Sequence, residues 1–155
     1  MKKFLLIAFG FLFFDQIVKN ILMFTFSFNS SVSIIPNFFS ITLVKNTGAA
    51  FSVLSSSTIF LVLVGIIALV LLYVFFIKDK DLSIIENFLY GALAGGILGN
   101  MIDRIIRGYV IDYLDFNIFG YNFPVFNVAD ICITVSIFIL IIFIFKGDEN
   151  EISSK

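Results

Sequence analysis

The residues best suited to chemistry in this chain are two aspartates, Asp112 and Asp130, which flank the ends of two long apolar segments. Two carboxyl groups brought close together resist double ionisation, so one keeps its proton while the other stays basic. The basic group can deprotonate a water molecule, and the protonated group can polarise a peptide carbonyl and then protonate the leaving nitrogen. Such a pair could hydrolyse a peptide bond without a metal ion or cofactor, and we expect neither.

Other catalytic groups are scarce. The chain has no histidine and one cysteine. The lack of histidine excludes a Ser-His-Asp triad and the His-dependent metalloprotease motifs, and one cysteine cannot form an internal disulfide or a Cys-rich metal site. A Ser-Lys site built on Lys19 would need a serine beside it in an activating motif, which the sequence lacks.

Asp130 also has a purely structural interpretation. With Asn127 as N-cap, Asp130 stands at the position of a capping box, and an acid there suits the helix dipole. Against this, the next stretch, Ile131–Phe145, is almost wholly apolar, so Asp130 lies at the membrane edge, where loss of water favours a shared proton. Asp115 follows Asp112 by three residues in an extended segment, so we expect it to point to the opposite side.

Composition places the pair in a membrane protein. The chain is 60% hydrophobic and 14% charged, with a mean hydropathy of +1.09, which leaves too little polar surface for a soluble globule. We predict one integral membrane domain, 1–155, with four spans at about 4–24, 58–77, 84–106 and 127–145. Outer segments of about 25–57 and 107–126 connect them. The net charge of −1 offers no basic patch for nucleic acid.

The two outer segments differ from the spans in pattern. Val32–Ile35 and Ile41–Val44 are β-rich runs broken by turn residues, and an open strand edge cannot lie in hydrocarbon. We therefore expect a small extracytoplasmic β-sheet at the membrane surface and, from 107–126, a second extracytoplasmic loop. The predicted fold class is a membrane all-α core of four transmembrane helices with these two additions.

The third span carries an unusual polar cluster. Asn100, Asp103, Arg104 and Arg107 follow the spacing i, i+3, i+4, i+7, which predicts one helix face. Charged groups at membrane depth cost about 2.5–3.5 kcal/mol each, so this face should look into the protein.

Two further patterns concern helix packing. Gly91, Gly95 and Gly99 recur every four residues and predict a ridge for close helix contact. Asp15 and Lys19 form an i, i+4 pair in the first span. This pair either makes insertion tolerable as an intrahelical ion pair or braces the site, and the sequence leaves both readings open.

Orientation follows from the basic residues of the short loops. An excess of lysine on the side of both termini and of the 78–83 loop marks that side as cytoplasmic. Both outer segments, Asp112 and the start of the fourth span then face outward.

The chain resembles the bacterial lipoprotein signal peptidases, also called signal peptidase II, in successive motifs that occur in the family's order. The motifs are Asp15-Gln16-Ile17-Val18-Lys19, Asn46-Thr47-Gly48-Ala49-Ala50-Phe51, Gly95 to Arg104 with Gly108-Tyr109-Val110-Ile111-Asp112, and Phe126-Asn127-Val128-Ala129-Asp130. The resemblance covers nearly the whole chain. One departure is Tyr113, where the family often has Phe.

The resemblance implies an aspartyl endopeptidase that removes the signal peptide from diacylglyceryl-modified prolipoproteins, cutting just before the lipidated cysteine. It implies that Asp112 and Asp130 are catalytic. Residues implied to bind substrate or support the site are Asp15, Lys19, Asn46, Gly48, Asn100, Asp103, Arg104, Asn127 and Ala129. The expected partners are diacylated prolipoproteins, membrane lipid and globomycin-type inhibitors, and the expected state is a monomer in the bacterial cytoplasmic membrane.

The main alternative is a small membrane transporter or proton channel, in which the intramembrane charges would form a polar pathway. The charges gather towards one face, and no inverted repeat is visible. A non-enzymatic scaffold with an ion-pair network is a third reading.

Overall fold

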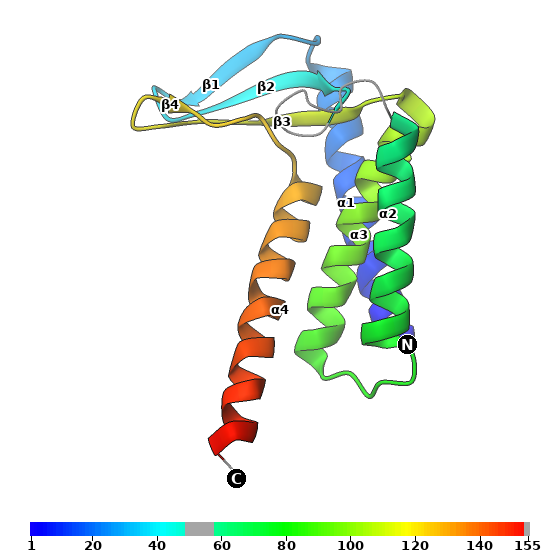
Figure 1. The fold of residues 1–155 in the computed structure, drawn as a ribbon. Coiled ribbons are helices and arrows are strands. Elements are labelled where there is room, and N and C mark those ends of the chain that lie inside the picture. Colours follow the sequence, from blue (N-terminus) through cyan, green and yellow to red (C-terminus); the bar gives the residue numbers. More distant parts are fainter. Residues whose placement is uncertain (49–57, 154–155) are drawn as a thin grey trace.

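The computed structural model describes residues 1–48 and 58–153, which are mainly helical (Figure 1). The α-helices are α1 (Lys2–Thr25), α2 (Thr58–Leu72), α3 (Ile84–Arg107) and α4 (Val128–Ser153), and α2 continues into a π-helical turn, η1 (Tyr73–Ile77). Within the described residues, α1 and Thr58–Ile77 are long and apolar enough to cross a membrane, and Val128–Phe143 is a shorter apolar helix. The polar residues and glycines of α3 lower its hydropathy, although it is as long as α1.

The described strands form one antiparallel sheet in the order β1-β2-β3-β4. They are β1 (Ser31–Ile35), β2 (Phe39–Asn46), β3 (Val110–Ile118) and β4 (Tyr121–Asn122). The second outer segment is therefore not a separate loop, as predicted, but supplies β3 and β4 to the same sheet. The prediction failed because β2 pairs with β3 across a whole helical hairpin, a contact that local pattern does not reveal.

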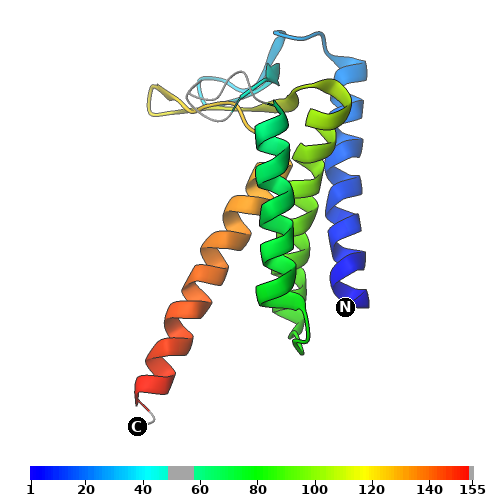
Figure 2. The same cartoon turned by 45° about the vertical axis from the view of Figure 1, so that its right-hand side comes forward.

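The sheet lies across one end of the helices and projects to one side above the start of α4, while the N-terminus and the 78–83 loop lie at the opposite end (Figures 1 and 2). The pairing of β3 within the sheet determines where its residues lie relative to the helices. Asp112 pairs with Val44 in β2, and the backbone of Leu114 forms a bridge with Phe126 just before α4. The start of β3 is thus fixed between β2 and the entry to α4.

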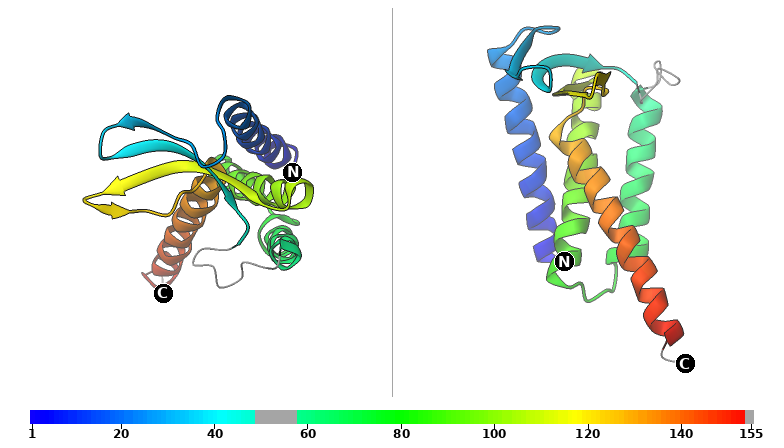
Figure 3. Two further views of the ribbon diagram at one scale, coloured as in Figure 1. Left: turned by 90° about the horizontal axis from the view of Figure 1, so that it is seen from above. Right: turned by 90° about the vertical axis from the view of Figure 1, so that its left-hand side faces the viewer.

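Helix α3 is the central helix, and its ends are set by local sequence. Ser83 and Glu86 form a complete capping box at its start, and Gly108 ends it in the left-handed region at φ 80°. The predicted glycine ridge lies against α1: a methyl group at Gly95 would stand 2.6 Å from the carbonyl oxygen of Ala8. A methyl group at Gly96, the next residue, would stand 2.7 Å from the carbonyl oxygen of Ala129 in α4. α3 therefore holds α1 and α4 on neighbouring faces (Figure 3).

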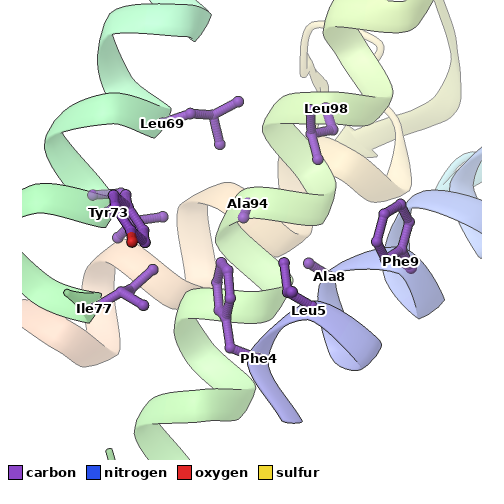
Figure 4. A pocket seen from close by; sticks show the side chains of 10 residues that line it. Phe4, Leu5, Ala8, Phe9, Leu69, Tyr73, Ile77, Ala94 and Leu98 are labelled. Atoms are coloured by element: carbon purple, nitrogen blue, oxygen red, sulfur yellow. The ribbon is translucent and has the colours of Figure 1, made fainter. Parts of the chain in front are cut away.

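At the end of the helices away from the sheet, α1, α2 with η1, and α3 enclose an apolar recess of about 180 Å³ (Figure 4). Phe4 of α1, Tyr73 of η1 and Ala94 of α3 are among the residues that line it. α4 contributes no residue to its described lining, although Ile133 and Leu140 of α4 pack against the same apolar core (Figures 1 and 3).

Candidate active site

Asp112 and Asp130 line the same cavity, which has a volume of about 480 Å³ and lies between the sheet and the helix ends. Asp112 comes from β3 and is only 2% exposed, and Asp130 comes from the first turn of α4. The described lining residues are Asn46, Gly48, Arg104, Asp112, Tyr121, Phe123, Pro124, Val125, Phe126 and Asp130. The cavity is thus polar at the two carboxyl groups and apolar along the 121–126 segment.

Two asparagine side chains join the carboxyl groups. Asn127 Nδ2 donates to Asp112 Oδ1 at 2.6 Å and contacts Asn100 Oδ1 at 3.2 Å. Asn100 Nδ2 in turn donates to Asp130 Oδ1 at 2.8 Å. A bridge of two amides therefore links the aspartates, and each aspartate receives a hydrogen bond that holds its carboxyl plane.

Asn46 supplies the second donor to Asp112. Its Nδ2 lies 2.8 Å from Asp112 Oδ2, while its Oδ1 accepts the backbone N–H of Gly48 at 3.1 Å. The turn at Gly48 therefore orients the amide so that its donor end faces the aspartate. The next residues of this motif, Ala49 to Phe51, lie outside the described residues.

The capping interpretation of Asp130 is also correct. Asp130 Oδ2 accepts the backbone N–H of Asn127 at 3.1 Å, and Asn127 Oδ1 accepts the backbone N–H of Asp130 at 3.0 Å. The cap uses one carboxylate oxygen, and Asn100 binds the other. Capping and membership of the cavity are therefore compatible, because the cap fixes the orientation of the side chain.

Burial dominates the electrostatics of Asp112. It raises the pKa of this carboxyl to about 6, against the hydrogen bonds from Asn46 and Asn127, which lower it. The charge of Asp130 adds to the rise. Asp112 therefore holds its proton to a higher pH than an ordinary aspartate, which is what a carboxyl group that donates to a carbonyl requires.

A buried ion cluster lies behind the amide bridge. Lys19, which is 0% exposed, lies 2.8 Å from Asp15 and 2.9 Å from Asp103. Its ammonium also donates to Asn100 Oδ1 at 3.0 Å. Both readings of the Asp15–Lys19 pair therefore hold: it is an intrahelical ion pair, and it fixes which end of the Asn100 amide faces Asp130.

Asp103 connects this cluster to the backbone beside Asp112. Its Oδ2 accepts the N–H of Ile111 at 3.2 Å, and its Oδ1 accepts from Arg107 and from Gln16. The predicted polar stripe of α3 does look into the protein, and it is wide enough to meet two neighbouring helices: Asp103 and Arg107 contact residues of α1, whereas Asn100 also reaches Asp130 of α4.

The other implied residues have defined contacts. Arg104 lines the cavity and its Nη1 donates to the carbonyl of Asn100 at 3.3 Å. Ala129 is 0% exposed, and its N–H donates to Asp15 Oδ1 at 3.3 Å. As expected, Asp115 faces away from the pair and accepts from Thr42 at 2.6 Å.

Sequence reasoning assigned no role to Gln16 or Tyr113, and it placed Arg107 in the polar cluster of α3 without a partner. Gln16 of α1 donates to Asp103 and accepts from Arg107, both on α3. Gln16 and Arg107 therefore help to hold α1 against α3. Tyr113 is buried, which raises the pKa of its phenol, and its hydroxyl accepts the N–H of Val128 at 3.3 Å. The i+4 spacing of Arg107 from Asp103 was the available signal for the role of Arg107, whereas no local pattern connects Tyr113 to the start of α4.

Comparisons with known proteins agree on one family. Residues 7–146 match the family model described as signal peptidase (SPase) II. The chain is 41% identical over 147 residues to the lipoprotein signal peptidases of Staphylococcus aureus strains JH9 and Newman, covering 95% of this chain and 90% of each relative.

Two solved structures of a bacterial membrane enzyme, determined by the in meso method, have the same fold. The one at 2.3 Å resolution gives a TM-score of 0.87 at 39% identity and covers 97% of this chain and 92% of that chain. The one at 1.9 Å gives 0.83 at 40% identity and covers 94% of both chains.

Proposed function

The chain belongs to the signal peptidase II family, and we propose that Asp112 and Asp130 are its catalytic pair. Members of this family are aspartic peptidases, and this enzyme cleaves the signal peptides of prolipoproteins at a bacterial membrane. The observation that carries the proposal is that the two aspartates, which come from different elements, line one cavity and are joined through Asn100 and Asn127.

The roles of the two carboxyl groups follow from their surroundings. Asp130 lies at a helix N-terminus and accepts the backbone N–H of Asn127 on one carboxyl oxygen and the side-chain N–H of Asn100 on the other, so both oxygens are held in a fixed direction at the cavity. We assign it as the base that takes a proton from the attacking water. Buried Asp112, with its raised pKa, is the group that donates to the scissile carbonyl.

Hydrolysis then proceeds without a covalent enzyme intermediate. Water oxygen bonds to the carbonyl carbon, its proton passes to Asp130, and the proton of Asp112 moves to the carbonyl oxygen. When the tetrahedral intermediate collapses, the carbon–nitrogen bond breaks, the leaving amine receives the proton held by Asp130, and Asp112 recovers its own from the hydroxyl. The products are the free signal peptide carboxyl and the amino group of the lipidated cysteine.

We place the catalytic pair at the extracytoplasmic surface of a four-span protein with both termini in the cytoplasm. The N-terminus, with Lys2 and Lys3, and the 78–83 loop, with Lys78 and Lys80, lie at the end opposite the sheet, which supports this orientation (Figure 2). The sheet would then rest at the membrane interface beside the diacylglyceryl group of the substrate. The transporter alternative is set aside because the chain is a peptidase and Asp15, Lys19 and Asp103 pair with one another.

The test compares purified wild type with Asp112→Asn and Asp130→Asn on a diacylated precursor and an unlipidated control, with products identified by mass. We expect each variant to lose cleavage by a factor of about 10³ or more, because neither amide can act as acid or base. Asp115→Asn is the matched control, since it changes an aspartate of the same strand that contacts Thr42. Near-normal turnover by either of the first two variants would refute the pair.

A further inference from the structure

We propose that an apolar groove between η1 and α4, floored by α3, binds the hydrophobic helix of the precursor's signal peptide. The groove has a volume of about 210 Å³ and is almost wholly apolar. One wall is formed by Leu72, the last residue of α2, and Phe76 of η1, and the other by Ile137 and Ile141 of α4. Tyr90 and Leu93 of α3 form the floor. The proposal rests on the function proposed above and adds the surface that holds the non-reacting part of the substrate.

The groove and the catalytic cavity are lined by residues of the same two helices, α3 and α4, and share no described lining residue. On α4, Ile137 and Ile141 follow Asp130 at i+7 and i+11, and on α3, Leu93 and Tyr90 precede Arg104 by 11 and 14 residues. At 100° per residue, each set returns to within about 40° of its starting direction. Both helices therefore carry one stripe that begins at the cavity and ends in the groove.

The length of this path fits a signal peptide. With a rise of about 1.5 Å per residue, the 11 residues on α4 and the 14 on α3 span about 16 and 21 Å. The apolar core of a secretory signal peptide has about 7–15 residues, which as a helix measures about 10–22 Å. A precursor with its scissile bond at the aspartates would therefore place its apolar helix beside this groove.

The other apolar recess lies off this stripe. The recess of Figure 4 is formed by α1, α2 with η1, and α3, and its α3 residues Ala94 and Leu98 point about 80° and 120° away from Arg104 around the helix. On the α1 side of α4, the path down from the cavity is closed where Ala129 N–H donates to Asp15. On the side facing η1, the stripe from Asp130 leads to the residues that line the apolar groove.

Two exposed aliphatic residues of α4 provide a matched test. Ile137 lines the groove and is 43% exposed, whereas Val135 is 48% exposed and points about 160° away around the helix. Both are β-branched and face an apolar environment, so Ile137→Trp and Val135→Trp add similar bulk to the same helix. Only the first fills the groove.

The first measurement compares kcat/KM for two diacylated substrates, a full precursor and a short peptide that lacks the apolar segment. We expect Ile137→Trp to lower kcat/KM for the full precursor about tenfold, mainly through KM, and to leave the short peptide unchanged. Val135→Trp should match wild type on both. Equal losses in the two variants, or an equal loss on the short peptide, would overturn the groove as the binding surface.

The second measurement needs no turnover, so it reports on the groove even if the catalytic assignment fails. Two proteins are mixed: a precursor with one cysteine in the middle of its apolar segment, and Cys132→Ala enzyme that carries either Ile137→Cys or Val135→Cys. Copper phenanthroline then oxidises the mixture and joins neighbouring thiols as a disulfide. The lipidated cysteine is a thioether and cannot react. Cross-linking at 137 and not at 135 supports the proposal. Equal cross-linking, or an enzyme dimer formed through 137 without precursor, contradicts it.

Discussion

Removing the Asn46 side chain should shift the pH dependence of cleavage. Asn46 donates to Asp112 Oδ2 at 2.8 Å, and this hydrogen bond stabilises the ionised carboxyl and lowers its pKa. Burial and the charge of Asp130 raise that pKa to about 6, so Asp112 keeps its proton to a higher pH than an ordinary aspartate. Loss of that proton removes the acid and sets the alkaline limb of the profile.

The expected shift follows from the strength of the bond. A hydrogen bond to a charged group contributes about 1.5–3 kcal/mol, and one pKa unit corresponds to about 1.4 kcal/mol, so Asn46→Ala should raise the pKa of Asp112 by about 1–2 units. Because the ionised form loses its donor, the alkaline limb moves to higher pH.

The assay is the initial rate of cleavage of a diacylated precursor at subsaturating concentration, measured by product mass across the range in which carboxyl groups titrate. Thr42→Val is the matched control, because it removes a comparable hydrogen bond from Asp115, which lies outside the cavity. The reasoning is refuted if the alkaline limb of Asn46→Ala stays with that of Thr42→Val or moves to lower pH.

Three further substitutions test the scaffold behind the pair, each by thermal unfolding of the purified protein. Lys19→Met leaves the buried Asp15 carboxylate and its neighbours without their cation and should lower the free energy of unfolding by about 3–5 kcal/mol. Gly99→Ala places a methyl group 2.5 Å from Asp15 Oδ2 and should cost about 1–3 kcal/mol, whereas Gly10→Ala, with nothing within 4 Å, should not destabilise. Tyr113→Phe removes the acceptor of one backbone N–H of α4 and should cost about 1 kcal/mol. An unchanged Tm for Lys19→Met would mean that the ion cluster is not stabilising.

Much of the helical framework and the candidate pair of aspartates could be predicted from the sequence. Apolar runs of membrane-spanning length and the glycines at i+4 spacing are local signals, and the structure has such runs in α1 and in Thr58–Ile77 and the glycine ridge in α3. The aspartates could be paired because few other residues in the chain can move protons and because they fit a known set of motifs.

The rest depends on contacts between distant segments. The pairing of β2 with β3 and the hydrogen bond from Tyr113 to α4 join residues whose proximity exists only after the helices pack. The division of the α3 polar residues between two neighbours is of the same kind: Asn100 and Arg104 serve the cavity, whereas Asp103 serves α1 and the Ile111 backbone. Side-chain spacing defines a stripe on a helix but not which neighbour each member meets.

The first turn of α4 supplies both Asp130 and Asn127, the residue that binds Asp112. A ribosome has to synthesise α1 to α3 and the strands β1 to β4 before either group exists, and the turn must then dock against α3 and β3. On the proposed mechanism, nascent chains that end before this turn cannot cleave a substrate. The arrangement therefore delays proteolysis until the start of α4 has been made and has docked, which protects neighbouring proteins in the bilayer from partly built enzyme.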